Sequence, residues 1–580
     1  MLKRLVFSSV LMFLWVAASQ QAAADPGVRV QSQGVVNSDL VPTVAQETPA
    51  DPIGDLTSPL PLDRKRILWH VADPLEALPR VAERLGESLP KADRKYYSDV
   101  QRLLARIERP NKLNLTLEDA LRRAMTHNFT VRISSYNPAV DTARIVEAEA
   151  AFDTSFFASV IKNKQNRPTA NALIGSNVDT LTLNGGLRKL LPTGMLATTS
   201  LNWVRNSNDF QFQQLNPQYT SAFVVEFRQP FLRGFGIDFN RSAIRLSQLD
   251  EQRSQHAFRR EVIDVMVNLE KAYWDLVRAR REVVISGRLL ASFERIYNFL
   301  WQRREFDAYK IQIADTKARL EKTKASFIQV ETNVRNAEDA LINQMNDPQI
   351  DLADDIEIVP TDFPHYSPVV LDRLSEVQIA LDHRHELAEA DLAVRQARVR
   401  VGQAKNGVLP QLDVTFRYTV DGLGESGHDA FSEVTKNDFH EYFISVEFEI
   451  PVGNRAARAR EVQARLRHGQ AIAALKQTYE NVILDVNVRL RQLAASFDQL
   501  GPNYESAEAN QDQVDAIVAR AESRNFVQLN QELNALTALA GSRRELIQSL
   551  IDYNMAIIQL ERAKGTLPEY DNIILNPQPE

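Results

Sequence analysis

Three short motifs in this 580-residue chain contain residue types that bind metals or cofactors in other proteins. His383-Arg384-His385-Glu386 holds two imidazoles, but residues two apart on a helix do not face each other, so we expect a surface role rather than chelation of one ion. Gly234-Phe235-Gly236 lacks the third glycine of a dinucleotide-binding loop, and a turn between a strand and a helix explains it better. The paired carboxylates Asp354-Asp355 lie in a charged loop, where we expect both to be solvated.

Recognisable enzyme signatures are missing from the sequence. It contains neither a P-loop nor an HExxH motif, and its nine histidines are scattered. It has no cysteine, which excludes a thiolate metal site, a cysteine nucleophile and disulfides. We therefore predict no catalytic residue, no cofactor and no bound metal. An exported enzyme is the weakest hypothesis, because it would need a convergent polar site and none is visible.

The composition also limits the possible functions. The chain is 44% hydrophobic and 25% charged, which is ordinary for a protein with a sizeable core. Its net charge of −7 argues against a nucleic-acid binder, because no basic excess exists to neutralise phosphates. After the N-terminus, no stretch reaches the ~18 apolar residues that a spanning helix needs. This pattern excludes a helical membrane transporter.

The N-terminus resembles a cleaved secretion signal. Lys3 and Arg4 precede the apolar run 5–18, and the small residues Ala22-Ala23-Ala24 precede Asp25. This order predicts a signal peptide over residues 1–24 and an exported protein, the alternative being a buried first helix. Cleavage would leave a mature charge of −9. No cysteine follows the expected cleavage site, so we expect no N-terminal lipid on cysteine.

Residues 25–110 are rich in proline and have no regular period, which predicts an extended N-terminal extension. Within it, only 92–108 has a helical pattern. A longer helical pattern covers 116–151 and begins at Thr116, a predicted N-cap with Asp119 three residues later. We expect Pro138 to kink or interrupt that helix.

A sustained heptad follows in a region without proline, from residue 231 to 347. Such a repeat predicts a coiled coil, and a helix over 242–303 would be roughly 90 Å long at 1.5 Å per residue. A second helix keeps the same phase, so the two form an antiparallel hairpin that turns near 304–310. The heptad positions are Phe258, Val262, Val265, Leu269, Ala272, Leu276, Ala279, Val283, Leu290, Phe293, Tyr297 and Leu300 in the first helix, and Ile313, Leu320, Phe327, Val330, Val334, Ala337 and Leu341 in the second.

Short alternating segments predict β-strands over 153–160, 177–188, 194–205, 221–229, 412–420 and 441–450, with a hairpin turn at 191–194. One face of the last three strands is apolar, and the other carries charges of both signs, as a water-filled lumen tolerates. An ordinary half-buried antiparallel sheet would alternate in the same way, so this alternative stays open. The candidate lumen-facing residues are Glu226, Arg228, Asp413, Thr415, Arg417, Glu447 and Glu449.

The plan of helix, strands and two long helices occurs twice. The segment 225–230 (VEFRQP) aligns with 446–451 (VEFEIP), and Arg304-Glu305-Phe306 aligns with Arg524-Asn525-Phe526. We predict a duplicated unit rather than unrelated domains. Its parts are a first repeat at 111–346, a linker or equatorial segment at 347–370, a second repeat at 371–566 and a C-terminal tail at 567–580. The second repeat has helical patterns at 371–406, 456–522 and 528–564, with a bend expected at Gly501-Pro502.

If these strands span a membrane, one chain cannot supply the barrel alone. An open sheet edge is not viable in lipid, and closure needs about 8 strands. The sequence predicts two to four strands in the first repeat and two in the second. Several chains would therefore have to contribute to one barrel.

This architecture resembles the TolC-like outer-membrane efflux family over roughly 111–566. The most specific stretches are 115–121 (LTLEDAL), 408–412 (VLPQL) leading into a strand and 448–451 (FEIP) leaving one. The resemblance implies a homotrimer with a shared 12-stranded barrel in the outer membrane and a helical tunnel through the periplasm. It also implies that the periplasmic end of the tunnel is closed until a periplasmic adaptor and an inner-membrane pump open it. The 177–206 hairpin departs from the simplest family pattern. It would either extend the extracellular end, which we favour, or add strands to the barrel.

The resemblance also identifies candidate gate residues at the periplasmic tip. The family's turn glycine corresponds to Tyr309 in the first repeat and to Asn525 in the second, and Asp315 matches an acid that helps to latch the closed state. The latch arginine corresponds to Val527. The acidic constriction ring corresponds to Gln531 and Asn534, so we expect a neutral amide ring here and no Arg–Asp latch through Val527.

The predicted fold is a mixed α+β membrane protein, in which a long coiled-coil tunnel continues into an outer-membrane β-barrel shared between three protomers. The predicted function is a passive outer-membrane exit duct for efflux or secretion, located in the outer membrane with its helical part in the periplasm. The alternative is a soluble periplasmic coiled-coil scaffold or adaptor without a membrane barrel. The two-faced strands favour the duct.

Overall fold

The computed structural model describes residues 91–106, 108–168, 176–210, 213–305, 310–353, 355–369, 371–519 and 526–573, all in the unit Leu62–Glu580. The predicted signal peptide, most of the N-terminal extension, Tyr309 and Asn525 lie outside the described residues. None of the helices in the described ranges is both long enough and apolar enough to cross a membrane.

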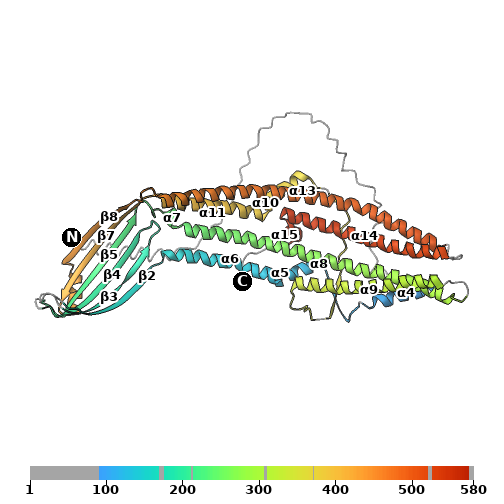
Figure 1. Cartoon of the computed structure of the whole chain (residues 1–580), viewed down its shortest axis with the longest axis horizontal. Helices are drawn as coiled ribbons and strands as arrows, with labels where there is room; N and C mark the ends of the chain where they lie inside the picture. The colour runs from blue at the N-terminus through green and yellow to red at the C-terminus, as the bar shows by residue number, and fades with distance from the viewer. Residues whose placement is uncertain are drawn as a thin grey trace, which may run out of the picture. The chain divides into compact units, whose positions relative to one another are not determined.

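Six antiparallel strands form the main sheet, in the order β2-β3-β4-β5-β7-β8. Figure 1 shows them side by side, next to one end of the long helices. The alternation of side chains predicted these strands, and the structure confirms all six and lengthens most of them, since the inter-strand ladders continue beyond the alternating residues. Their bounds are Ser155–Asn166 for β2, Asn177–Leu190 for β3, Leu196–Asn208 for β4, Gln218–Pro230 for β5, Gln411–Gly424 for β7 and Phe439–Glu449 for β8.

The hairpin β3–β4 is an integral part of this sheet, so the expected extension at the far end is wrong. β3 pairs with β2 from Asn177 to Arg188, and β4 pairs with β5 from Leu196 to Asn206. The turn that joins β3 to β4 returns to the helical end, where the Gly236 amide donates to the Thr193 carbonyl at 3.2 Å. The backbone ladders on both sides hold the hairpin in the plane of the sheet. The sheet of one chain thus has six strands.

Four long helices lie against one another in the order α6-α8-α11-α13, and each is joined to a strand at the same end of the sheet. α6 (Phe129–Glu149) leads through the 3-10 turn η2 (Ala150–Phe152) into β2. β5 leads through α7 (Ile237–Asn240) into α8 (Ser242–Gln302), α11 (His385–Val408) leads into β7, and β8 leads into α13 (Arg455–Ala519). The helices therefore follow the lateral order of the strands to which they connect.

The predicted coiled-coil hairpins are confirmed. α8 packs along α9 (Lys310–Met345), and α13 packs along α14 (Phe526–Lys564). Most of the predicted heptad positions of α8 and α9 are buried in one core cluster, and Ala272, Tyr297, Ile313 and Ala337 pack against it partly buried. Burial of this apolar seam stabilises the hairpin, since long exposed helices gain little from propensity alone.

Two expected helix breaks differ from the structure. The helix predicted over 116–151 is divided at Asn128, between α5 (Leu117–His127) and α6, while Pro138 lies inside α6. The Asn128 side chain accepts bonds from the Thr130 and Val131 amides, so it caps α6 at this point. Likewise α13 continues through Pro502 as one helix.

The second repeat also begins with two helices where the sequence predicts one. α10 (Arg373–His383) ends at Arg384, and α11 begins directly after it. The Arg384 guanidinium donates to the Asp485 carboxylate of α13 at 2.9 Å and to the Ala563 carbonyl of α14 at 2.8 Å. These bonds hold the helix junction against the α13–α14 hairpin.

Sequence patterns missed a two-stranded parallel sheet, in which β1 (Asn111–Leu115) pairs with β6 (Ile356–Pro360). β6 lies in the segment predicted as a proline-rich linker.

The helix predicted at 92–108 is confirmed as α4 (Lys91–Leu104), and its Val100 and Leu103 join the core of the α8–α9 hairpin. The remaining helices are α12 (Gly427–Lys436), which packs on β5 and β7, and α15 (Leu567–Tyr570), which contacts α14.

Candidate functional site

The candidate lumen-facing residues come together as ion pairs on one face of the sheet. The Arg228 guanidinium of β5 lies 2.8 Å from the Asp413 carboxylate and 3.8 Å from the Glu447 carboxylate. The Arg417 guanidinium of β7 lies 2.6 Å from the Glu226 carboxylate. The strand register explains these pairs. Glu226 lies opposite Arg417, and Arg228 lies opposite Thr415, two residues from Asp413, which in turn lies opposite Glu447. The charges of this face are thus largely paired across neighbouring strands.

The two other candidates on this face fit the same register. Thr415 lies opposite Arg228, and Glu449 lies opposite Gln411 at the helical end of β8. Sequence reasoning missed Phe443, whose ring lies 5.3 Å from the Arg417 guanidinium carbon. It also missed the polar residues of the hairpin on this face, which the alternation in β3 and β4 could have identified. They are Thr180, Thr182 and Asn184 of β3 and Thr198, Ser200, Asn202 and Asn206 of β4.

The opposite face of the sheet is apolar and largely uncovered in the chain. Its exposed members come from all strands, and Ile444 at 69% and Phe156 at 73% are among the most accessible apolar side chains. Single exposed apolar residues are normal on a protein surface, but a contiguous face of this size marks a lipid or protein contact. The face includes Phe156, Val160, Leu183, Leu187, Leu201, Phe227, Phe416, Tyr442, Ile444, Val446 and Phe448.

At the far end of the helices, two of the candidate gate residues, Asp315 and Asn534, are linked through Arg319. The Asp315 carboxylate accepts from Arg319 of the same helix at 3.1 Å, and the Arg319 guanidinium also donates to the Asn534 side-chain oxygen of α14 at 2.9 Å. Gln531 is exposed. The sequence predicted Asp315 and Asn534 but missed Arg319, which the i, i+4 spacing from Asp315 could have suggested.

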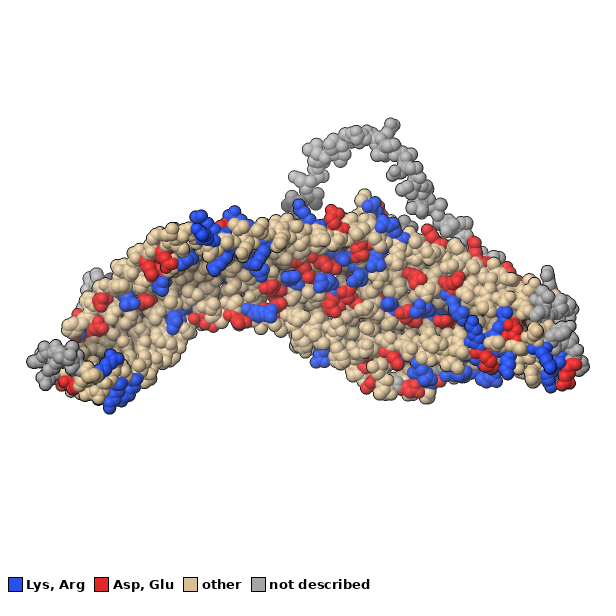
Figure 2. All heavy atoms as spheres, in the orientation of Figure 1, with Lys and Arg blue, Asp and Glu red and all other residues tan. Residues whose placement is uncertain are grey.

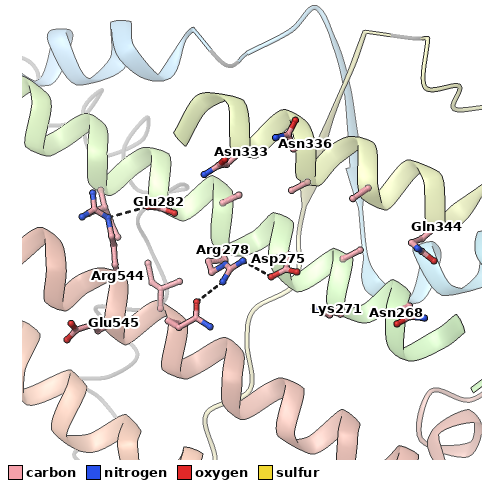
Figure 3. Close-up of a pocket in the computed structure, with 17 residues that line it drawn as sticks. Asn268, Lys271, Asp275, Arg278, Glu282, Asn333, Asn336, Gln344, Arg544 and Glu545 are labelled. Atoms are coloured by element: carbon pink, nitrogen blue, oxygen red, sulfur yellow. Dashed lines mark hydrogen bonds and ion pairs between the residues drawn. The ribbon is translucent and has the colours of Figure 1, made fainter. Parts of the chain in front are cut away.

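A polar groove of about 730 Å³ lies between α8, α9 and α14. Figure 3 shows its labelled side chains, with Arg278 beside Asp275 and Arg544 beside Glu282. The Arg278 guanidinium also donates to the Gln548 side-chain oxygen at 2.8 Å. Its charged lining residues are Lys271, Asp275, Arg278, Glu282, Arg544 and Glu545, so the two signs balance. On the face seen in Figure 2, basic and acidic side chains are likewise interspersed along the helices. A balanced polar wall selects weakly for either sign of charge.

A buried charged cluster, which we call the equatorial hub, joins β1, β6, α8 and α9. Arg280 of α8 donates to Glu357 at 2.5 Å and lies 3.3 Å from Glu338, while Arg109 lies 2.8 Å from Glu338. Glu338 and Glu357 are each only 1% exposed. Burial raises the pKa of Glu338, whereas for Glu357 the opposing effect of burial is outweighed by hydrogen bonds from Arg280 and Arg109, which lower its pKa. Removal of any one member would leave a buried charge without its partner, so the stability of the hub depends on all of them.

The histidines of the motif at 383–386 do not act together, as expected. The His385 Nδ1 lies 3.3 Å from the His256 Nδ1 of α8, whereas the His383 Nδ1 lies 2.9 Å from the Ile379 carbonyl oxygen of its own helix. Among the described residues, no group of three or more metal-binding side chains comes together. Gly234-Phe235-Gly236 forms a turn between β5 and α7, and the Asn406 side chain bonds to its backbone.

A carboxyl of the C-terminal segment lies near a buried carboxyl of α8. Glu270 is 1% exposed, and half-buried Asp571 interacts with it electrostatically. Burial and the nearby Asp571 raise the pKa of Glu270 to about 9, and burial together with Glu561 raises that of Asp571 to about 6. Because the folded pair binds protons more tightly than the unfolded chain, the stability of this contact must fall as pH rises through that range.

We expect the thermal midpoint of the protein to decrease between about pH 5 and about pH 9. We expect Glu270→Gln to flatten part of that decrease, because the amide has a similar shape but does not ionise. Circular dichroism melts across this range measure both slopes. If the thermal midpoint falls equally steeply with pH in the variant and in the parent protein, the Glu270–Asp571 contact does not cause the pH dependence.

Comparison with known proteins agrees with this geometry. Residues 377–566 match the family model described as "Outer membrane efflux protein". The chain is similar to the TolC outer membrane proteins. It is 22% identical to the outer membrane protein TolC of Vibrio cholerae over 320 residues, which are 54% of this chain and 70% of that relative. It is 23% identical to the Escherichia coli TolC over 324 residues, which are 54% of this chain and 63% of that relative.

A solved structure confirms the fold. The Campylobacter jejuni CmeC outer membrane channel matches with a TM-score of 0.57 at 14% identity, covering 78% of this chain and 86% of that one. The family model and the two curated relatives are thus described as outer membrane proteins. These likenesses support an outer-membrane location for this chain.

Proposed function

We propose that the chain is one subunit of a homotrimeric, passive exit duct for efflux or secretion. The observation that carries this proposal is the two-faced sheet, apolar on one side and polar on the other, whose strands continue at one end into four long helices. In a barrel, the apolar face contacts lipid and the face with Glu226, Arg228, Asp413 and Arg417 lines the water-filled lumen. The helices then form the wall of the periplasmic tunnel.

Solutes cross such a duct by diffusion, and energy enters through partners. We propose, from the family resemblance, that an inner-membrane pump provides the energy and that a periplasmic adaptor opens the tip. The tip is formed by the ends of the α8–α9 and α13–α14 hairpins. The Arg319–Asn534 bond joins these two hairpins and is therefore one of the contacts that opening would break.

Planar-bilayer recordings of the purified protein test the channel itself. Stepwise single-channel conductance is the expected result, and a protein that inserts but never conducts, even after Arg319→Ala and Asn534→Ala remove the tip bond, contradicts the proposal. Alanine at these exposed positions is expected to change folding stability by less than about 1 kcal/mol.

The tip amides make a separate prediction about cations. Because Gln531 and Asn534 carry no charge, we expect divalent cations to reduce the conductance only weakly. Gln531→Asp would place one carboxylate per subunit near the axis and create a strong block, since hard cations prefer several carboxylate ligands. Asn534→Asp is the matched control with a smaller effect, because Arg319 would neutralise the new charge. Strong divalent block of the parent protein would contradict the neutral ring.

A further inference from the structure

The sheet ends in two strands with one unpaired edge each. Among the described residues, β2 and β8 each have a neighbour on one side only. An open edge leaves unpaired backbone amides and carbonyls, which lipid cannot satisfy. Because the sheet has an even number of alternating strands, β2 and β8 run in opposite directions, so β8 of one copy can pair antiparallel with β2 of the next. The edges therefore fit a second copy of this chain.

The hairpin β3–β4 has the side-chain pattern of membrane strands. Leu183, Leu187 and Leu201 share the exposed apolar face, and Asn184 and Asn202 lie opposite each other on the polar face. Both strands exceed the 9–11 residues that a tilted membrane strand needs. The hairpin therefore continues both faces of the sheet across its full height.

Close backbone packing fixes the hairpin at the helical end. Gly194 has a φ of +93°, and a Cβ there would lie 2.5 Å from the Gly234 carbonyl oxygen of the β5–α7 turn. Thr193 donates through its hydroxyl to the Gln229 side-chain oxygen at 3.2 Å. A side chain at 194 would push the hairpin turn away from the β5–α7 junction, so the glycine is required for the strands to lie side by side.

We propose that three copies close an 18-stranded barrel, half as many strands again as the 12 that the family resemblance implies. This inference rests on the proposed trimer. Six strands at about 4.8 Å spacing and about 40° tilt occupy about 38 Å of the barrel's circumference, whereas four strands occupy about 25 Å. The four helices that meet the sheet occupy about 40 Å of the tunnel's circumference at an interaxial distance of about 10 Å. The hairpin thus matches the width of the barrel to the width of the tunnel.

The closed barrel has a backbone radius of about 18 Å, compared with about 12 Å for 12 strands. Side chains occupy about 5 Å of that radius, which is half the usual spacing between packed sheets. The remaining opening, about 13 Å in radius, admits bulky hydrophilic cargo that a 12-stranded barrel would exclude at its outer end. Its wall in β3 and β4 is mostly threonine, serine and asparagine, with one cationic side chain, Arg188, near the helical end.

Cysteine pairs test the strand order directly, because the natural chain has no cysteine. Ser159, Asn184, Asn202 and Ala222 lie in one row across β2, β3, β4 and β5. We expect Ser159→Cys with Asn184→Cys to form a disulfide in outer membranes, and Ser159→Cys with Ala222→Cys to form none within the chain. A disulfide needs Cα atoms within about 7 Å, so the second pair forms only if β2 pairs directly with β5. That result would overturn the six-stranded contribution.

The seam between copies is tested separately. Ser159→Cys combined in turn with Ser445→Cys and Glu447→Cys is expected to give covalent dimers and trimers on denaturing gels. If no cross-link forms between copies while the β2–β3 disulfide forms, the six-stranded sheet is supported and the trimeric barrel of the proposed function is wrong. If cross-links between copies form together with the β2–β5 disulfide, the trimer is supported and the count of 18 strands is wrong.

Polymer exclusion provides a measurement without substitutions. Polyethylene glycols of increasing size, added on the barrel side of a planar bilayer, reduce conductance only when they enter the pore. We expect entry up to a hydrodynamic radius of about 13 Å, and a cut-off near 7 Å would overturn the wide barrel.

Discussion

Replacing Val225 with arginine is expected to destabilise the assembled barrel by about 2–4 kcal/mol, the cost of a basic side chain on the lipid face near the membrane midplane. Val225 lies near the middle of β5, opposite Tyr418 of β7, on the apolar face of the sheet. An arginine there must either lose its hydration or drag water into the lipid. Guanidinium titrations of protein refolded into vesicles measure the free energy of unfolding.

The neighbouring Val224 gives a matched control, because it is the same residue on the opposite face. It shares the polar face with Glu226, and it lies opposite Thr419. Val224→Arg points into water in a barrel, so we expect it to cost less than about 1 kcal/mol and to lower cation conductance instead. Equal losses for both variants would contradict the assignment of one face to lipid and the other to the lumen.

Replacing Arg280 with alanine is expected to destabilise the helical part by about 3–5 kcal/mol, because it leaves Glu338 and Glu357 buried with fewer cationic partners. Both carboxylates are 1% exposed and are held in place by the hub. Arg280 also donates to the Ile358 carbonyl of β6 at 2.9 Å, so the loss would loosen the β1–β6 sheet as well. Urea unfolding followed by far-ultraviolet circular dichroism measures the change.

Arg122 provides the control for the hub, since it also has two acidic partners, Glu118 and Asp119, but on the solvent-exposed side of α5. Arg122→Ala is expected to cost less than about 1 kcal/mol, as surface ion pairs usually do. A loss at Arg280 no greater than the loss at Arg122 would show that the hub is not a stabilising junction.

Local patterns predicted most of the elements. The heptad from Phe258 to Leu300 and the alternation in β5, β7 and β8 have periods of 3.5 and 2 residues, which identify buried seams and two-sided strands without tertiary information. The ion-paired face follows from the same alternation. Its partners Arg228 and Asp413 come from different repeats, so the sequence predicted the face but not the pairing.

Features built from distant segments could not be predicted in this way. β1 and β6 are five residues each and lie more than 200 positions apart, and β6 ends at Pro360 in a proline-rich segment that resembles a loop. The hub depends on that pairing. The β3–β4 hairpin was predicted as strands, but its neighbours are fixed by backbone register and by the close approach at Gly194, neither of which leaves a local signal.

Membrane fractionation combined with the mass of the extracted oligomer tests the central claim most directly. We predict that the full chain, produced in a Gram-negative host, sediments with the outer membrane on a density gradient, requires detergent for release and has the protein mass of three chains by light scattering. Recovery as a monomer in the soluble periplasmic fraction, with no outer-membrane signal, would contradict the exit duct and favour a periplasmic scaffold or adaptor.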